Sequence, residues 1–163
     1  NEGSNSFLSP TVFLTNANHI LNKMDELHVV TERHNADIVC ITESWLDSAT
    51  PGSLCSLSDY VVYRKDRASG QGGGVLCYVS DSIQSFEIKP VIHCPIDFDF
   101  EIIWVILRPR ILPRPLSCIV FAVVYVPPWY NVQLCKELKS YMLSCIDFYG
   151  EIYSSWFYHL RRL

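Results

Sequence analysis

The sequence has 163 residues, of which 49% are apolar, enough for one domain with a sizeable buried core. This composition excludes a disordered or fibrous protein. A formal charge of −4 argues against a protein that coats nucleic acid by neutralising many phosphates, although a local site remains open. The longest apolar run, Cys118 to Val126, is far shorter than the roughly 20 residues of a membrane-spanning helix. We therefore expect no membrane span.

The cysteines are spread along the chain without any Cys-x-x-Cys pair. This spacing fits neither a zinc finger nor a disulfide scaffold, so we predict reduced cysteines in the core and an intracellular compartment. The sequence begins at Asn1 rather than with methionine. We interpret it as a fragment or processed piece, with an N-terminal extension over residues 1–10.

Apolar runs predict a series of strands around one early helix. Residues 11–15 form a short apolar stretch that predicts a strand, and apolar residues then recur every three or four positions over residues 20–30, as in an amphipathic helix. Residues 36–42 form a short, continuous run rich in β-branched residues, which is typical of a strand covered on both faces. Further strands are expected at residues 60–64, 75–79, 83–88, 100–107 and 118–126. One β-α-β unit followed by about five strands predicts an α+β fold with a mixed or mainly antiparallel sheet.

The pattern changes after Pro127-Pro128. Residues 131–147 carry apolar positions at helical spacing, and residues 148–163 form an aromatic-rich tail. The glycine-rich segment 70–74 precedes a strand and is not followed by Gly-Lys-Ser or Gly-Lys-Thr. It therefore predicts a hairpin turn rather than a phosphate-binding loop.

Three polar side chains stand at the ends of predicted strands. Glu43 follows strand 36–42, Asn16 follows the first strand, and Tyr125 ends the last one. A carboxylate in such a position is a suitable ligand for Mg²⁺. Simpler interpretations are that Glu43 caps the turn at Trp45 and that Asn16 caps the following helix. From the residues alone, the convergence of three such groups is a weak argument for a metal-assisted site.

Five motifs in register extend this interpretation. They are Thr-Asn-Ala-Asn at 15–18, Ile-Thr-Glu-Ser-Trp-Leu at 41–46, Tyr-Arg-Lys-Asp-Arg at 63–67 with Gly-Gly-Gly-Val at 72–75, Phe-Glu-Ile-Ile-Trp at 100–104, and Tyr-Val-Pro-Pro at 125–128. In order and spacing, roughly residues 11–130 resemble the endonuclease/exonuclease/phosphatase superfamily, and within it the endonuclease domain of LINE-type non-LTR retrotransposons. Abasic-site endonucleases, inositol-phosphate phosphatases and deadenylases share that core, but the context of the motifs favours the retroelement branch.

The resemblance implies a Mg²⁺-dependent DNA endonuclease that nicks target DNA by phosphodiester hydrolysis, with DNA as partner and a nuclear location. It implies catalytic roles for Asn16, Glu43 and Tyr125. Glu43 matches the family's magnesium-binding glutamate, and Asn18 stands where relatives carry Asp or Asn near the metal. In this context, basic residues within segments 64–67 and 108–114 are candidates for phosphate contacts.

The sequence departs from the family after Tyr-Val-Pro-Pro. It contains no Asp-x-Asn and no Asp-His, and Asp147-Phe148-Tyr149 is the nearest approach. In the family these groups orient or deprotonate the attacking water, so we expect little or no nuclease activity. The same shortening predicts an incomplete α/β sandwich whose second sheet is largely missing, ending in a truncated or diverged tail. The alternative is a non-catalytic retroelement remnant with at most weak nucleic-acid or protein binding.

Overall fold

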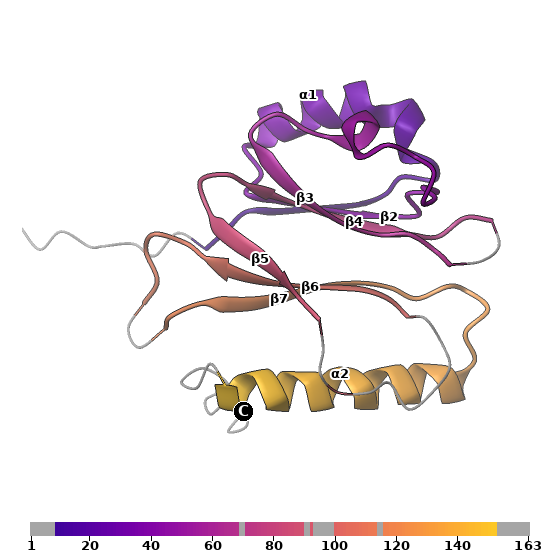
Figure 1. Ribbon diagram of the computed structural model, residues 1–163, viewed down its shortest axis with the longest axis vertical. Coiled ribbons are helices and arrows are strands. Elements are labelled where there is room, and N and C mark those ends of the chain that lie inside the picture. The colour runs from indigo at the N-terminus through magenta and orange to yellow at the C-terminus, as the bar shows by residue number, and fades with distance from the viewer. Residues whose placement is uncertain (1–8, 69–70, 90–91, 93–99, 114–115, 153–163) are drawn as a thin grey trace, which may run out of the picture.

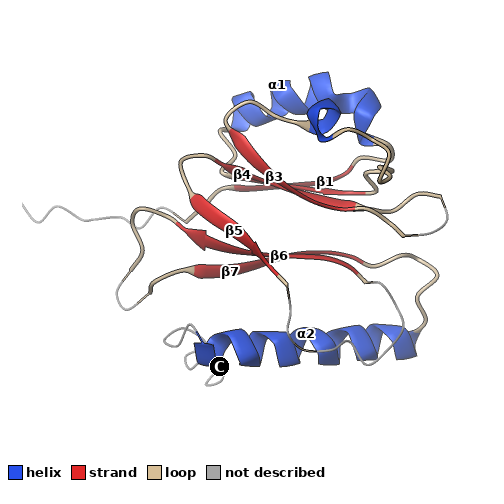
Figure 2. Ribbon diagram, viewed as in Figure 1, coloured by secondary structure: helices blue, strands red, loops and turns tan. Residues whose placement is uncertain are grey.

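The computed structural model describes residues 9–68, 71–89, 92, 100–113 and 116–152 and arranges them in four layers (Figure 1). One helix, a four-stranded sheet, a three-stranded sheet and a second helix follow one another from the top to the bottom of the view (Figure 2). The expected N-terminal extension is described only at Ser9 and Pro10. Residues 153–163 of the aromatic tail lie outside the described residues.

The strands form two sheets, with the orders β1-β2-β4-β3 and β5-β6-β7. Strands β1 and β2 are parallel and are joined through a helical crossover, whereas the other paired strands are antiparallel. The elements are β1 (Val12–Asn16), η1 (Ile20–Lys23), α1 (Met24–His34), β2 (Ile38–Thr42), η2 (Gly52–Cys55), β3 (Tyr60–Lys65), β4 (Val75–Ser80), β5 (Gln84–Ile88), β6 (Glu101–Arg108), β7 (Ile119–Tyr125) and α2 (Val132–Ile152). The predicted α+β class, with one β-α-β unit and then a run of strands, is confirmed.

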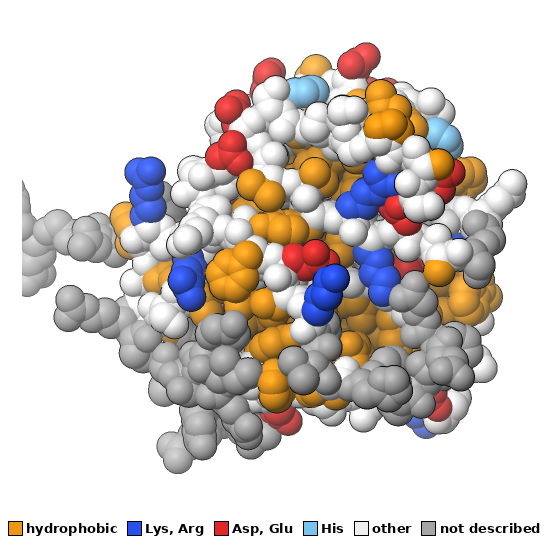
Figure 3. Space-filling view, in the orientation of Figure 1, with side chains coloured by type: hydrophobic (Ala, Val, Ile, Leu, Met, Phe, Trp, Pro, Cys, Tyr) orange, Lys and Arg blue, Asp and Glu red, His pale blue; other side chains and the backbone are white. Residues whose placement is uncertain are grey.

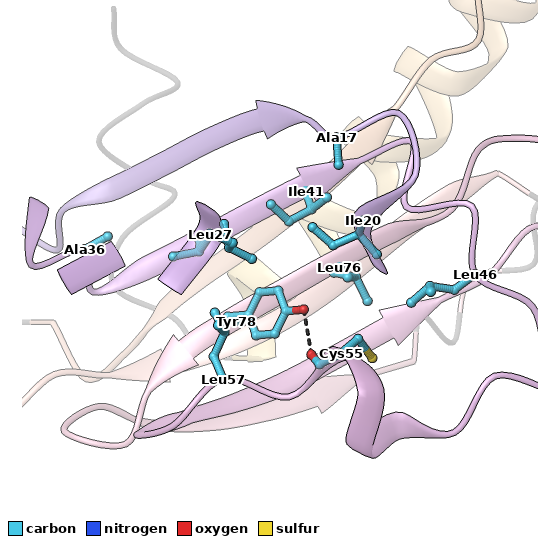
Figure 4. Close-up of a cluster of buried hydrophobic side chains, with 11 residues drawn as sticks. Ala17, Ile20, Leu27, Ala36, Ile41, Leu46, Cys55, Leu57, Leu76 and Tyr78 are labelled. Carbon is cyan, nitrogen blue, oxygen red and sulfur yellow. Dashed lines mark hydrogen bonds between the residues drawn. The ribbon is translucent and has the colours of Figure 1, made fainter. Parts of the chain in front are cut away.

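Strands β2 and β4 are apolar except at their last residues, Thr42 and Ser80, because both faces of the first sheet are covered. Side chains alternate along a strand, so Cys40 packs between the two sheets while its neighbour Ile41 packs under η1 and α1. Figure 4 shows the cluster under the helix, in which the Tyr78 hydroxyl donates a hydrogen bond of 2.7 Å to the carbonyl of Cys55. The run at residues 36–42 therefore contains a strand that is covered on both faces, as predicted.

The second sheet covers the inner face of the first. Ile103, Val105 and Leu107 of β6 are buried and pack with Ile38 and Val79 of the first sheet. An incomplete sandwich with a largely missing second sheet was expected, but the described residues form a three-stranded second sheet that covers this inner face. The reason is that β5, β6 and β7 pair with one another into a sheet of their own and do not extend the first sheet.

Helix α2 covers the outer face of the second sheet. Trp104 of β6 packs against it, and its ring centroid lies 6.0 Å from that of Tyr149. The helix ends at Ile152, beyond the predicted boundary at Asp147, so the first residues of the expected tail continue the helix. No helix in the described part of the chain has the length and apolar character that a membrane span requires.

The described cysteines are in the core, with one exception. Cys135 on α2 is exposed, whereas the others are buried: Cys40, Cys55, Cys77, Cys118 and Cys145. A hydrogen bond with Cys40 and burial between the sheets raise the pKa of the Cys77 thiol, so this thiol stays protonated. Cys94 lies outside the described residues.

Candidate active site

The parallel pairing of β1 with β2 brings the two predicted strand-end residues to one edge of the first sheet. Asn16 pairs with Thr42, and Glu43 follows directly. The contact continues past the strand ends, where the main-chain N–H of His19 donates to the carbonyl of Glu43 at 3.0 Å. Asn16, Asn18 and Glu43 therefore share this edge.

The carboxylate of Glu43 is held in a defined orientation. Its Oε2 accepts hydrogen bonds from the Trp45 indole Nε1 at 2.6 Å and from the main-chain N–H of Gly73 at 2.9 Å. Neither bond uses Oε1. Glu43 and Trp45 have φ values of 55° and 57°, in a left-handed region that costs of order 1–3 kcal/mol for a non-glycine residue. The N–H of Trp45 donates to the carbonyl of Gly73 at 2.9 Å, which helps to hold this conformation.

The predicted hairpin turn is the loop that makes these contacts. Strands β3 and β4 are antiparallel neighbours, and residues 71–74 lead into β4. Gly73 has a φ of 72°, and a Cβ there would lie 2.3 Å from Cζ of Arg67. Glycine thus lets the loop main chain lie against the Arg67 guanidinium while its N–H reaches Glu43. The loop orients a carboxylate, which is a different task from cradling a phosphate.

Tyr125 reaches the same end of the sandwich from the second sheet. It pairs with Glu101 across β6 and β7. Glu101 is 5% exposed, and its carboxylate accepts from the main-chain N–H of Gly74 at 2.6 Å and from Nε of Arg67 at 2.5 Å. Cζ of Arg67 lies 5.9 Å from the centroid of the Tyr125 ring. Tyr125 is thereby connected to the loop that holds Glu43.

Glu101 and Arg67 are central to this arrangement, and neither was predicted as a site residue in its own right. Arg67 was considered only as a phosphate contact, and Glu101 only as part of a motif. The available signal is the single carboxylate at the start of the otherwise apolar strand β6. A buried charge is paired in most proteins, so such a residue predicts a buried cationic partner, although not which one.

The simpler interpretations of Asn16 and Glu43 hold only in part. Asn16 does not cap the helix, because its Oδ1 accepts from the N–H of Asn18 at 3.1 Å, which is an Asx turn at the strand end. Glu43 does contact Trp45, but through the indole rather than the main chain. Both side chains therefore shape the edge of the sheet locally, and each retains polar atoms that these bonds do not use.

The basic segments mostly have partners within the protein. Arg64 forms an ion pair of 2.7 Å with Asp66, and Arg108 lies 5.4 Å from the centroid of the Phe86 ring. Arg114 lies outside the described residues. On the face shown in Figure 3, basic and acidic side chains are interspersed rather than gathered in one basic patch. Binding of an anion at this end would therefore depend on contacts with individual side chains rather than on a continuous positively charged surface.

The residues at this edge fit one mode of metal binding and not another. Among the described residues, no group of three or more His, Cys, Asp and Glu side chains is placed to hold a metal ion. A closed cage built by the protein is therefore not formed by this part of the chain. Mg²⁺, however, is often held through one or two carboxylates together with water and substrate phosphates. Glu43, with Oε1 outside both of its hydrogen bonds, fits this second mode.

Comparison with known proteins shows which solved structures share this fold. No protein-family model matches the sequence. The chain is 25% identical over 141 residues to a probable RNA-directed DNA polymerase from transposon X-element of Drosophila melanogaster, which covers 83% of this chain and 14% of that protein. Among solved structures it is similar to the endonuclease domain of TRAS1, a telomere-specific non-LTR retrotransposon, with a TM-score of 0.54, 14% identity and coverage of 81% of this chain and 54% of that one.

Two further solved structures share the fold. AP endonuclease LMAP from Leishmania major has a TM-score of 0.57 at 15% identity, over 84% of this chain and 46% of that one. The human Nocturnin catalytic domain has a TM-score of 0.57 at 13% identity, over 85% of this chain and 59% of that one. The chain thus has the fold of the endonuclease/exonuclease/phosphatase superfamily, as the sequence motifs predicted. Two of the similar proteins come from transposable elements. The chain spans about half the length of these solved structures.

Proposed function

We propose that the chain is part of a DNA endonuclease-type domain of a retroelement. It binds a phosphodiester at the edge that carries Glu43, and these 163 residues hydrolyse it little or not at all. The observation that supports the proposal is the Glu43 carboxylate, which Trp45 and Gly73 orient at the end of the sandwich. Asn16 lies at the same edge, and Tyr125 is connected to it through the second sheet.

The roles follow from the atoms that remain available. Glu43 would hold Mg²⁺, which when bound neutralises negative charge on the phosphate. Asn16 uses its Oδ1 for the turn at Asn18, so its amide NH₂ remains to donate to a phosphate oxygen. The phenol of Tyr125 would position the same phosphate. Asn18 is a further candidate for contact with the cation.

Little turnover is expected because no residue in this sequence matches the family's groups that activate water. The chain has no Asp-x-Asn and no Asp-His, and general acid–base catalysis alone is typically worth about 10²- to 10⁴-fold in rate.

The alternative is a remnant that turns nothing over and has at most weak nucleic-acid or protein binding. The net charge of −4 favours weak binding, because non-specific affinity for DNA depends on cationic contacts. The proposed endonuclease-type domain and the non-catalytic remnant differ in whether binding of DNA depends on Glu43 and Mg²⁺.

Two assays on the 163-residue chain test the proposal. Plasmid nicking with Mg²⁺ is expected to be no faster for the wild type than for Glu43→Ala. In fluorescence anisotropy with a short duplex, Mg²⁺ is expected to increase the affinity of the wild type and not that of Glu43→Ala. The exposed Glu87 provides the matched control, since it lies on β5, which carries none of the proposed site residues, and Glu87→Ala should behave as the wild type.

Each contrary result has a defined meaning. Nicking by the wild type that disappears in Glu43→Ala would show an active endonuclease and overturn the expected inactivity. An equal effect of Mg²⁺ on the wild type and on Glu43→Ala would remove Glu43 from the binding site and leave the non-catalytic remnant.

A further inference from the structure

A buried ion pair joins the two sheets beside the proposed site. Nε of Arg67 and Oε1 of Glu101 are 2.5 Å apart, and the two side chains are 18% and 5% exposed. Arg67 follows β3 in the first sheet, whereas Glu101 begins β6 in the second. A buried pair of this kind is weak evidence for stability, because its desolvation offsets much of the attraction. What it does determine is how the groups around it are placed.

Glu101 is connected to Glu43 through two successive peptide units of the loop. Its Oε2 accepts from the N–H of Gly74 at 2.6 Å, and the adjacent N–H of Gly73 donates to Glu43 at 2.9 Å. Consecutive N–H groups of the loop thus connect two carboxylates from different sheets. Displacement of Glu101 would move these peptide units and with them the orientation of Glu43.

Arg67 holds the same loop from its other side. Its Nη1 donates to the carbonyl of Gln71 at 3.0 Å, and its Cζ lies 5.9 Å from the ring centroid of Tyr125. The guanidinium therefore contacts the start of the loop, the Glu101 carboxylate and the Tyr125 ring together. A planar group with several fixed donors can do this, and a lysine ammonium cannot reproduce it.

We propose that Arg67 and Glu101 are positioning residues that set the placement of Glu43 relative to Tyr125, and thereby the affinity of this edge for a divalent cation. The second part rests on the proposed function, since it takes Glu43 as the cation's protein ligand. The first part concerns the geometry of the free protein and stands without it. Arg67 and Glu101 themselves do not touch the cation.

The Trp45 indole provides a direct readout, because its Nε1–H donates to Glu43 at 2.6 Å. In ¹H–¹⁵N NMR spectra of the full chain, its resonance is assigned by Trp45→Phe. Glu101→Gln should shift this resonance, since the amide replaces one of two accepting oxygens by a donor. Asp66→Asn is the control: it makes the same chemical change in a neighbouring ion pair, whose carboxylate is more exposed, at 19%, and bonds Arg64 instead of the loop.

The indoles of Trp104 and Trp129 distinguish repositioning from general damage. If Glu101→Gln acts only on the loop, these two resonances remain in place while that of Trp45 moves. Arg67→Lys keeps the positive charge but loses the planar donors, so we expect it to shift the Trp45 resonance as well, by less than Glu101→Gln does. Should Glu101→Gln fail to fold, Arg67→Lys provides the test. If the Trp45 resonance stays in place in every one of these single variants that folds, the proposal is overturned.

A titration with Mn²⁺ tests the affinity. The paramagnetic ion should broaden the Trp45 resonance in the wild type, with a midpoint about 10-fold or more higher in Glu101→Gln, as is typical when a residue that orients a metal ligand is lost. Equal midpoints in the two proteins would overturn this part of the inference. If Mn²⁺ leaves the wild type unbroadened, the proposed function fails, whereas the shift of the indole still decides whether the pair positions Glu43.

Discussion

The packing of the second sheet on the first predicts a large cost for shortening Ile103. This side chain is 1% exposed and lies between the sheets with Val105 and Leu107. Removing most of a buried isoleucine costs roughly 2–5 kcal/mol, from lost transfer free energy and from the cavity left behind. For a chain of 150–250 residues each kcal/mol corresponds to roughly 2–4 °C in Tm, so Ile103→Ala should lower Tm by roughly 4–20 °C.

Ile111 offers a control with the same chemical change. It is 65% exposed, so Ile111→Ala should change the free energy of unfolding by no more than about 0.5 kcal/mol. Urea denaturation followed by circular dichroism measures both variants against the wild type. If Ile103→Ala is as mild as Ile111→Ala, the inner face of the second sheet is not packed on the first, and the four-layer arrangement is refuted.

Two further changes test the surroundings of the site. Tyr78→Phe should cost about 1–3 kcal/mol in urea denaturation, because the buried carbonyl of Cys55 loses its donor. Burial raises the pKa of the Tyr78 hydroxyl above the value it has in the unfolded chain. Its contribution to the free energy of unfolding is therefore complete below about pH 10 and decreases as the pH rises further. Above about pH 10 the wild type should lose more stability than Tyr78→Phe, and equal losses would contradict this cause. Gly74→Ala should cost at least about 1 kcal/mol, since φ is 80° and the new Cβ would lie 2.4 Å from Ser44 Oγ. Gly52→Ala has open space around it, and an equal cost there would argue against this close contact.

Local pattern carried the prediction of the strands and of Glu43 as a candidate site residue. Residues 38–41 are apolar at every step because the strand is covered on both sides, and this constraint is visible within a short stretch of sequence. Glu43 was found for a related reason, since a polar residue directly after such a strand must emerge at the rim of the sheet. The helical spacing of residues 20–30 likewise follows from a single buried face.

The cover of the first sheet and the connection between the two carboxylates depend on contacts between distant parts of the chain. The apolar runs of β5, β6 and β7 are equally compatible with one extended sheet or with two, because a strand's pattern reports burial and not the neighbour that causes it. Arg67 and Glu101 are 34 positions apart, and the local sequence around either residue does not identify the other as its partner. Sequence pattern thus located the edge of the sheet and its carboxylate. Long-range pairing brought Tyr125 to the same end and supplied the ion pair that connects it to Glu43, because such partners are chosen by packing across the sandwich.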